Sequence, residues 1–310
     1  MEEKIEIMEL LQNKQALELE LKSIAYGAVE IRENDSNKYI YVHYREDGVS
    51  LTKYVGEYSE ELYNLVLNNS IKAKEIKRKI REINKKLKQL NYIEEELSPK
   101  VENNIDFAKR HLVDTIYKQA ILEGVATTFA DTESIIEGGK VNNMTSEDIL
   151  KIINLKHAWE FILNKNVILS NTNFALLCEI NKMIEEGFYY SAGKIRNVPV
   201  TIGGTKWTPD FPIESRIKEE LEEIFNKEID DIDKSIELLL YVMKKQIFID
   251  GNKRTSVIFS NHYLISKGKG IIAIPAELTA EFKDLLISYY EGKDENIIKM
   301  FIKEKCYMKL

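Results

Sequence analysis

Apolar residues recur at helical spacing over most of the chain. Residues 1–25 have this pattern, and a second segment with it covers residues 59–92. In the second segment the apolar positions follow steps of four, three, four and three, at Ile76, Ile80, Ile83, Leu87 and Leu90. This spacing is typical of a helix that packs along another helix, and residues 1–25 are the nearest candidate partner.

The pattern changes between residues 26 and 56. Short runs rich in β-branched and aromatic residues, GAVEIR, KYIYVHY and LTKYVG, are separated by turn-forming residues at 34–37 and at Gly48. Such runs predict a small antiparallel meander.

A domain boundary is predicted at Ser98-Pro99, because the residue before a proline is disfavoured in helix. Residues 1–98 then form a helical arm with a small β-meander, and residues 99–310 form a second domain. Its predicted helices cover residues 101–123, 126–137, 146–164, 172–187, 213–227, 231–247, 252–267, 276–290 and 294–307. Residues 194–208 are the exception: a Val-Pro-Val-Thr-Ile run and a Gly203-Gly204 turn predict a β-hairpin.

Composition supports this reading. Only 14 of the 310 residues are glycine and 5 are proline, so few residues of the chain disfavour a helix. A hydrophobic content of 44% excludes wholesale disorder. We therefore expect a mainly α protein, preceded by an α/β N-terminal module.

Charge bears on possible partners. The net charge of −7 argues against nucleic acid as the partner of the whole surface. Residues 71–90, however, hold nine Lys and Arg against two Glu, a local charge of +7. This basic helix is either a contact for nucleic acid or an acidic partner, or the solvated outer face of a helical hairpin. The basic residues are Lys72, Lys74, Lys77, Arg78, Lys79, Arg81, Lys85, Lys86 and Lys88.

The N-terminus, MEEKIEIMELL, is acidic where a signal peptide is basic. No apolar run approaches the ~18 residues of a membrane span. A cytoplasmic protein without membrane contact is expected.

Candidate chemistry is concentrated in residues 246–255, Gln-Ile-Phe-Ile-Asp-Gly-Asn-Lys-Arg-Thr. They form a short turn that opens a helix, where free N–H groups attract anions. Arg254 and Lys253 suit phosphate oxygens, Asp250 is a hard oxygen ligand for Mg²⁺, and Gly251 permits close backbone approach. The alternative is an ordinary capped helix with surface charges.

At these residues the sequence resembles the Fic/Doc family, whose signature is His-x-Phe-x-(Asp/Glu)-Gly-Asn-(Gly/Lys)-Arg. Phe248 and the run Asp250 to Arg254 match it. Residues 193–210 resemble the family's target-docking flap, at Arg196, Ile202, Gly203, Gly204 and Trp207. Ser134, Glu137 and Gly138 are similar to its inhibitory segment. The resemblance covers about residues 105–310 and implies a helical bundle with a β-hairpin flap.

The resemblance also implies an activity: transfer of AMP from ATP to a hydroxyl of a target protein docked on the flap. By the same resemblance, Asp250 would hold Mg²⁺, and Asn252 and Arg254 would hold phosphates. Gly251 would supply a backbone N–H, and Lys253 is typical of the Doc-like branch, which transfers the γ-phosphate.

Two departures from the signature concern the chemistry. Gln246 stands where the family has its catalytic histidine, and an amide has no pKa near neutrality with which to accept a proton. Val257 replaces the second arginine, which pairs with the inhibitory glutamate in regulated members, and Glu133 stands four residues before Glu137. Autoinhibition by the family's route is therefore not expected.

His43, His111, His157 and His262 lie elsewhere, and we expect structural roles for them. Two hypotheses remain open: a nucleotide-dependent transferase with weakened or altered activity, and a catalytically inactive binding or regulatory protein. A second copy of the chain is a further potential partner.

Overall fold

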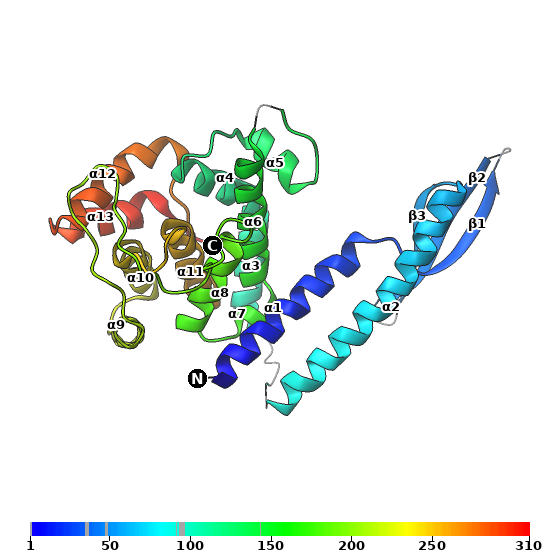
Figure 1. Ribbon diagram of the computed structural model, residues 1–310, viewed down its shortest axis with the longest axis horizontal. Helices are drawn as coiled ribbons and strands as arrows, with labels where there is room; N and C mark the ends of the chain where they lie inside the picture. The colour runs from blue at the N-terminus through cyan, green and yellow to red at the C-terminus, as the bar shows by residue number, and fades with distance from the viewer. Residues whose placement is uncertain (1, 35–36, 47–48, 91, 93–96, 143) are drawn as a thin grey trace. The chain divides into compact units, whose positions relative to one another are not determined.

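The computed structural model describes residues 2–34, 37–46, 49–90, 92, 97–142 and 144–310, and most of them are helical. The prediction of a mainly α protein with a small N-terminal sheet is confirmed. The chain divides into two compact units, residues 1–93 and residues 94–310 (Figure 1). Of the helices described, none is long and apolar enough to cross a membrane.

The first unit begins with a helical hairpin. Helices α1 (Glu2–Ser23) and α2 (Glu60–Gln89) lie side by side and run in opposite directions (Figure 1). Met8 and Leu11 of α1 are buried, as are Ile76 and Leu87 of α2. The predicted packing of these two helices is confirmed.

A three-stranded antiparallel sheet joins the two helices. Its order is β1 (Ala28–Asn34), β2 (Asn37–Glu46) and β3 (Val49–Glu57), as the predicted meander requires. Ile40 and Val42 of the central strand pack against Val66 of α2 in a small core. The turn residues predicted at 35–36 and at Gly48 lie outside the described residues.

The first helix of the second unit begins at Pro99. Ser98 caps this helix by accepting a hydrogen bond from the amide of Val101. The segment predicted as one helix over 101–123 is two helices, because the chain leaves helical geometry at His111 (φ −99°, ψ 8°). The helices up to the flap segment are α3 (Pro99–Arg110), α4 (Leu112–Leu122), α5 (Phe129–Ile136), α6 (Ser146–Ile162), α7 (Lys165–Ile168) and α8 (Phe174–Ile184).

The remaining elements follow the flap segment. They are α9 (Glu214–Asn226), α10 (Asp231–Lys245), α11 (Asn252–Ser266), β4 (Ile271–Ile272), the 3₁₀ turn η1 (Ala276–Leu278), α12 (Thr279–Tyr290), α13 (Glu295–Phe301), the π-helical turn η2 (Ile302–Cys306) and β5 (Tyr307–Met308). The predicted helix over 294–307 therefore ends early, and β5 pairs with β4. Strands this short carry no readable periodicity.

Helix α11 is the centre of the second unit. Its residues from Arg254 to Ile265 are buried, and it contacts α3, α6, α7, α8 and α10. A helix that is enclosed on all sides shows no amphipathic pattern, and its start is fixed by its neighbours rather than by solvent.

Candidate functional site

The turn between α10 and α11 covers residues 246–251, and its first and last residues have left-handed backbone angles. Gln246 ends α10 at φ 48°, and Gly251 precedes α11 at φ 73°. Between them Ile247 and Phe248 are buried, so the turn is held down by its apolar residues. A Cβ added at Gly251 would lie 2.3 Å from Oε1 of Glu185, which explains the glycine.

The side chain of Asn252 closes the turn on itself. Its Oδ1 accepts from the amide of Phe248 at 2.9 Å, and its Nδ2 donates to the carbonyl of Phe248 at 2.8 Å and to Oε1 of Gln246 at 3.2 Å. Asn252 is buried. The side-chain amide of Asn252 thus holds the turn in shape, and its contact with a phosphate stays a prediction.

Arg254 is buried among carboxylates. Its Nη2 lies 2.9 Å from Oε1 of Glu185 and 3.6 Å from Oδ2 of Asp250, and its Nε lies 3.6 Å from Oε2 of Glu123. In the part of the chain that the structure describes, Nε and Nη1 of Arg254 nevertheless have no hydrogen-bond partner. The guanidinium is therefore neutralised by charge but not satisfied in hydrogen bonds.

Glu185 is the most perturbed acid of this cluster. Burial raises the pKa of Glu185 to about 7, Arg254 acts against this shift, and the charges of Asp250 and Glu123 add to it. Near neutral pH, Glu185 is therefore divided between its charged and protonated forms. Protonation removes one of the charges that hold Arg254.

Asp250 and Lys253 form the solvent-facing part of the turn. The Asp250 side chain is 49% exposed, and its Oδ1 accepts from the amide of Gly251 at 2.7 Å. Lys253 is half-buried and lies 3.5 Å from Oε1 of Glu123. The Asp250 charge also raises the pKa of the neighbouring Tyr189, whose ring is exposed.

Asp250 fits a magnesium ion only in part. Among the described residues, no group of three His, Cys, Asp or Glu side chains is placed to hold a metal ion. An open carboxylate can bind Mg²⁺ when phosphate oxygens and water supply the other ligands, as is usual for this ion. The residues present therefore suit a metal that arrives with a polyphosphate.

Gln246 contributes hydrogen bonds but no titratable group. Its Nε2 donates to the carbonyl of Met243 at 2.6 Å.

His262, the histidine nearest to Gln246 in sequence, is buried and hydrogen-bonded to the Val167 carbonyl and the Thr172 hydroxyl. Burial lowers the pKa of His262 to about 4, so it is a neutral structural residue.

The predicted flap follows an irregular path. No strand is assigned over residues 194–210, all of which the structure describes, so the β-hairpin prediction is wrong. Main-chain carbonyl groups of this segment bond to the side chain of Arg196 instead of to a neighbouring strand. Arg196 donates from Nε to the carbonyl of Gln246 at 2.6 Å, and from its terminal nitrogens to the carbonyls of Val198 at 2.8 Å and Asp210 at 2.6 Å. These bonds to both ends of the segment replace a strand ladder. Arg196 is buried and holds the segment in place, and the docking of a target on this segment stays a prediction.

The tip of the flap lies on α12. Trp207 is half-buried and stacks on Tyr290 with ring centroids 5.2 Å apart, and Thr205 donates to Glu291 at 2.9 Å. Gly204 (φ 85°) approaches Ile287, while Ile202 is half-buried and Gly203 exposed. Tyr290 in turn donates to the carbonyl of Met243, so one aromatic stack connects the flap to the end of α10.

The segment similar to the inhibitory motif lies around the end of α5. Ser134 is within the helix, Glu137 is its exposed C-cap, and Gly138 follows at φ 80°. Glu137 forms no ion pair with another described residue. Val257, at the position of the family's second arginine, is buried. The carboxylates beside the motif are instead those of Glu123, from the end of α4, and Glu185, from the end of α8.

Sequence reasoning missed Glu123, Glu185 and Asn181. Asn181 donates to the Asp250 carbonyl at 3.0 Å and to Thr255 at 3.1 Å, and accepts from the Gly193 amide at 2.9 Å, so it joins the motif turn to the start of the flap. The local sequence gives no clear signal for them, because Asn181 and Glu185 stand among other polar residues, Glu179, Lys182 and Glu186.

The turn, with its exposed aspartate and buried arginine, lies in a segment that matches a known protein family. Residues 171–264 match the Fic/DOC family model. The matched Fic/DOC domain contains α8, the flap, α10 and the motif turn. No curated protein matches the chain in sequence.

Solved structures share the Fic fold. Fic-1 (residues 134–508) from C. elegans is 19% identical with a TM-score of 0.53, over 79% of this chain and 73% of that one. A Fic domain containing signaling protein from Bacteroides thetaiotaomicron is 18% identical with a TM-score of 0.55, over 68% of this chain and 86% of that one. At these identities the likeness concerns the fold alone.

Proposed function

We propose that the Fic/DOC domain binds ATP with Mg²⁺ at the turn that opens α11, and that it is a weak protein adenylyltransferase. The observation that carries this proposal is Arg254, which is buried and close to the free amides of a helix start. Its Nε and Nη1 have no hydrogen-bond partner among the described residues. Phosphate oxygens would satisfy those donors with charge-assisted bonds.

The acidic side chains around the turn are the reason to propose that ATP binds together with Mg²⁺. Lys253 and Arg254 face three acids, Asp250, Glu123 and Glu185, so a polyphosphate alone meets an excess of negative charge. Asp250 would hold Mg²⁺ between the protein and the phosphates, and the ion would neutralise both. Lys253 and Arg254 would then position the phosphate chain.

Gln246 accounts for the expected weakness of transfer. In adenylyl transfer the target hydroxyl oxygen forms a bond to the α-phosphorus, pyrophosphate leaves, and the hydroxyl proton must be removed. Gln246 cannot accept this proton, and a missing general base typically costs ~10²–10⁴ in rate. Positioning and phosphate electrostatics remain available.

The target would dock beside the flap. Val198, Phe211 and Ile213 are exposed apolar side chains at the two ends of this segment. Exposed apolar groups next to a fixed main-chain segment suit an extended peptide of the target protein.

Calorimetry with the full chain tests nucleotide binding. We expect heat with ATP and Mg²⁺, a marked loss of affinity in Asp250→Ala, and loss of binding in Arg254→Ala. Arg216→Ala is the matched control, because Arg216 is an exposed residue of α9 and its removal changes the charge equally. Absence of binding by the wild-type chain, or an equal effect of Arg216→Ala, would refute the proposal. Asp250→Ala lies on the surface and separates loss of binding from loss of folding.

The position of the label on ATP separates the alternatives. Label from the α-phosphate on a target protein indicates adenylyl transfer, and label from the γ-phosphate indicates the Doc-like phosphotransferase that Lys253 resembles. Binding without either label indicates a catalytically inactive Fic domain with a regulatory role.

A further inference from the structure

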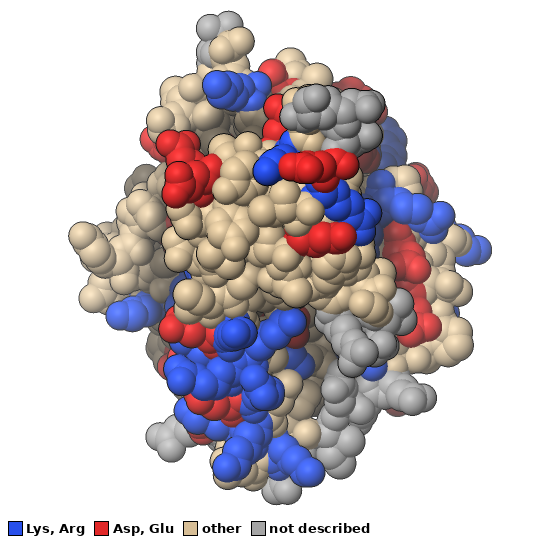
Figure 2. Space-filling model, turned by 90° about the vertical axis from the view of Figure 1, so that its right-hand side faces the viewer, with Lys and Arg blue, Asp and Glu red and all other residues tan. Residues whose placement is uncertain are grey.

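Helix α2 carries a straight row of cations. Five basic residues each precede an apolar seam residue of α2 by two positions, which places them about 200° around the helix from the seam. Lys77 lies beside them and completes the row. The row consists of Lys74, Lys77, Arg78, Arg81, Lys85 and Lys88. Figure 2 shows Lys and Arg side chains gathered over this part of the molecule.

The charges of the row are largely uncompensated. Its residues are exposed, apart from the half-buried Lys77. Within the described ranges, the only ion pair in the row joins Arg78 to Glu82 at 3.9 Å, and both side chains are mostly exposed. Such a pair contributes little, so the row presents a nearly continuous positive potential.

An aromatic groove adjoins the first lysines of the row. It has a volume of about 790 Å³, and its lining includes Tyr26, Tyr44 and Tyr63 together with Lys74 and Lys77. The Tyr26 and Tyr44 ring centroids are 5.7 Å apart, and Nζ of Lys77 lies 4.6 Å from the Tyr26 centroid. Aromatic faces and phosphate-binding cations thus occur together in one unit of the chain.

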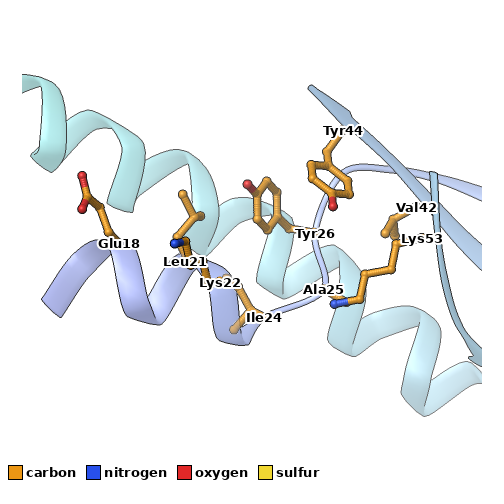
Figure 3. Close-up of a pocket in the computed structure, with 9 residues that line it drawn as sticks. All are labelled: Glu18, Leu21, Lys22, Ile24, Ala25, Tyr26, Val42, Tyr44 and Lys53. Carbon is orange, nitrogen blue, oxygen red and sulfur yellow. The ribbon is translucent and has the colours of Figure 1, made fainter. Parts of the chain in front are cut away.

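The other side of the same tyrosines is less suitable for an anion. Tyr26 and Tyr44 also line a smaller hollow of about 330 Å³, where the carboxylate of Glu18 offsets part of the positive charge of Lys22 and Lys53 (Figure 3). The larger groove contains no acidic side chain in its lining. Its composition therefore favours a ligand that combines flat rings with negative charge.

We infer that the first unit binds single-stranded nucleic acid, with the phosphate backbone along the row on α2 and a base in the tyrosine groove. Base stacking on aromatic side chains beside a basic track is the usual recognition mode for single strands. A membrane is a poorer partner, because over the length of the row the apolar seam of α2 packs on α1, and the exposed apolar residues of α2, Leu65, Leu67 and Ile71, precede the row. An acidic peptide would use the row but leave the rings unused.

The length of the row predicts the size of the site. Lys74 and Lys88 are fourteen residues apart in one helix, or about 21 Å at 1.5 Å per residue. At 3.4 Å per nucleotide, this corresponds to about six nucleotides.

Fluorescence anisotropy with the full chain and a labelled oligothymidylate of about 20 nucleotides tests this inference. Lys85→Gln/Lys88→Gln removes two row lysines, whereas Lys79→Gln/Lys86→Gln removes two exposed lysines of the same helix outside the row. We expect the first variant to bind more weakly and to reduce the salt slope by about 1.4, or ~0.7 for each phosphate contact, and the second to bind like the wild type. Tyr26→Leu should weaken single-strand binding by at least about fivefold and affect duplex binding less.

Three results would overturn the inference. These are no binding at about 50 mM salt, equal losses in the two lysine variants, and binding of phosphatidylserine vesicles or polyglutamate with the same affinity and the same dependence on Lys85 and Lys88. A wild-type response of Tyr26→Leu would likewise reject the placement of a base. All of these readouts are independent of ATP binding by the second unit.

Discussion

At the scale of single residues, Arg254 and the acids around it determine how the motif turn responds to ligands and to pH. Arg254 lies within 4 Å of three carboxylates, yet two of its nitrogens form no hydrogen bond within the described part of the chain. These unsatisfied donors are the basis of the proposed anion site, and the acids would set the conditions under which an anion binds there.

Glu185 makes stability depend on pH. Its pKa is about 7 in the folded protein against 4.5 ordinarily, so the folded state binds its proton more strongly than the unfolded state does. The contribution of Glu185 to the free energy of unfolding is therefore present below pH ~4.5 and is lost as the pH rises to ~7. Glu185→Gln does not titrate and should not lose stability in this range. The unfolding free energy of the variant minus that of the wild type should therefore increase from pH 5 to 7.

Urea unfolding at several pH values measures this difference. Glu186→Gln is the matched control, because Glu186 is exposed and adjacent in sequence. A difference between Glu185→Gln and wild type that is constant from pH 5 to 8 would contradict the raised pKa.

Gln246→His should restore a group that can accept a proton. Histidine is among the residues that tolerate the left-handed region, and Gln246 has a φ of 48°, so the turn should survive the exchange. We expect α-phosphate label on protein to increase by ~10²-fold or more over wild type. The measurement is autoradiography after incubation with cell lysate, and Gln246→Asn serves as the control without a base. An unchanged signal in a folded Gln246→His protein that binds ATP would show that Val257 or the flap also limits transfer.

At the scale of elements, the flap depends on one buried arginine. Arg196→Gln removes charge-assisted bonds to the carbonyls of Gln246, Val198 and Asp210, and the loss of such bonds costs ~1.5–3 kcal/mol each at most, because water can replace the arginine at the exposed residues Val198 and Asp210. We expect faster proteolytic cleavage within residues 197–209, detected by mass spectrometry. Arg216→Gln should leave the cleavage rate unchanged. Equal cleavage of the two variants would mean that the stacking of Trp207 on Tyr290 is sufficient.

The sequence predicts the elements better than their contacts. Apolar periodicity located the helical hairpin and most helices of the second unit, and the motif residues located the turn. The β-hairpin prediction for the flap is wrong because carbonyl groups of this segment accept hydrogen bonds from the Arg196 side chain. The β-propensity of a sequence gives no information about such bonds. Glu123 and Glu185 reach Arg254 from the ends of α4 and α8, more than sixty residues away in the chain, and local patterns contain no such information.

At the scale of the whole molecule, each unit has its own apolar core. Ile40 and Val42 pack with Val66 in the first unit, while α11 is enclosed by helices of the second. Ile40→Val should cost ~0.5–1.5 kcal/mol of stability. We expect amide hydrogen exchange to accelerate in residues 28–66 and to stay unchanged in residues 99–310, with ATP affinity unaffected. Faster exchange throughout α11 would indicate one cooperative unit instead.

The bonds of Arg196 have a consequence for how such a protein can diversify. They address main-chain carbonyls, which every amino acid supplies, so the two ends of the segment are held independently of their side chains. Gly204, Thr205 and Trp207 hold the tip of the segment. Under the proposed function, substitutions at the remaining positions between residues 199 and 208 would alter which polypeptide is selected without moving the ends of the segment. Selectivity and chemistry could then evolve separately, and exchanging these positions between relatives would be a practical route to a new target.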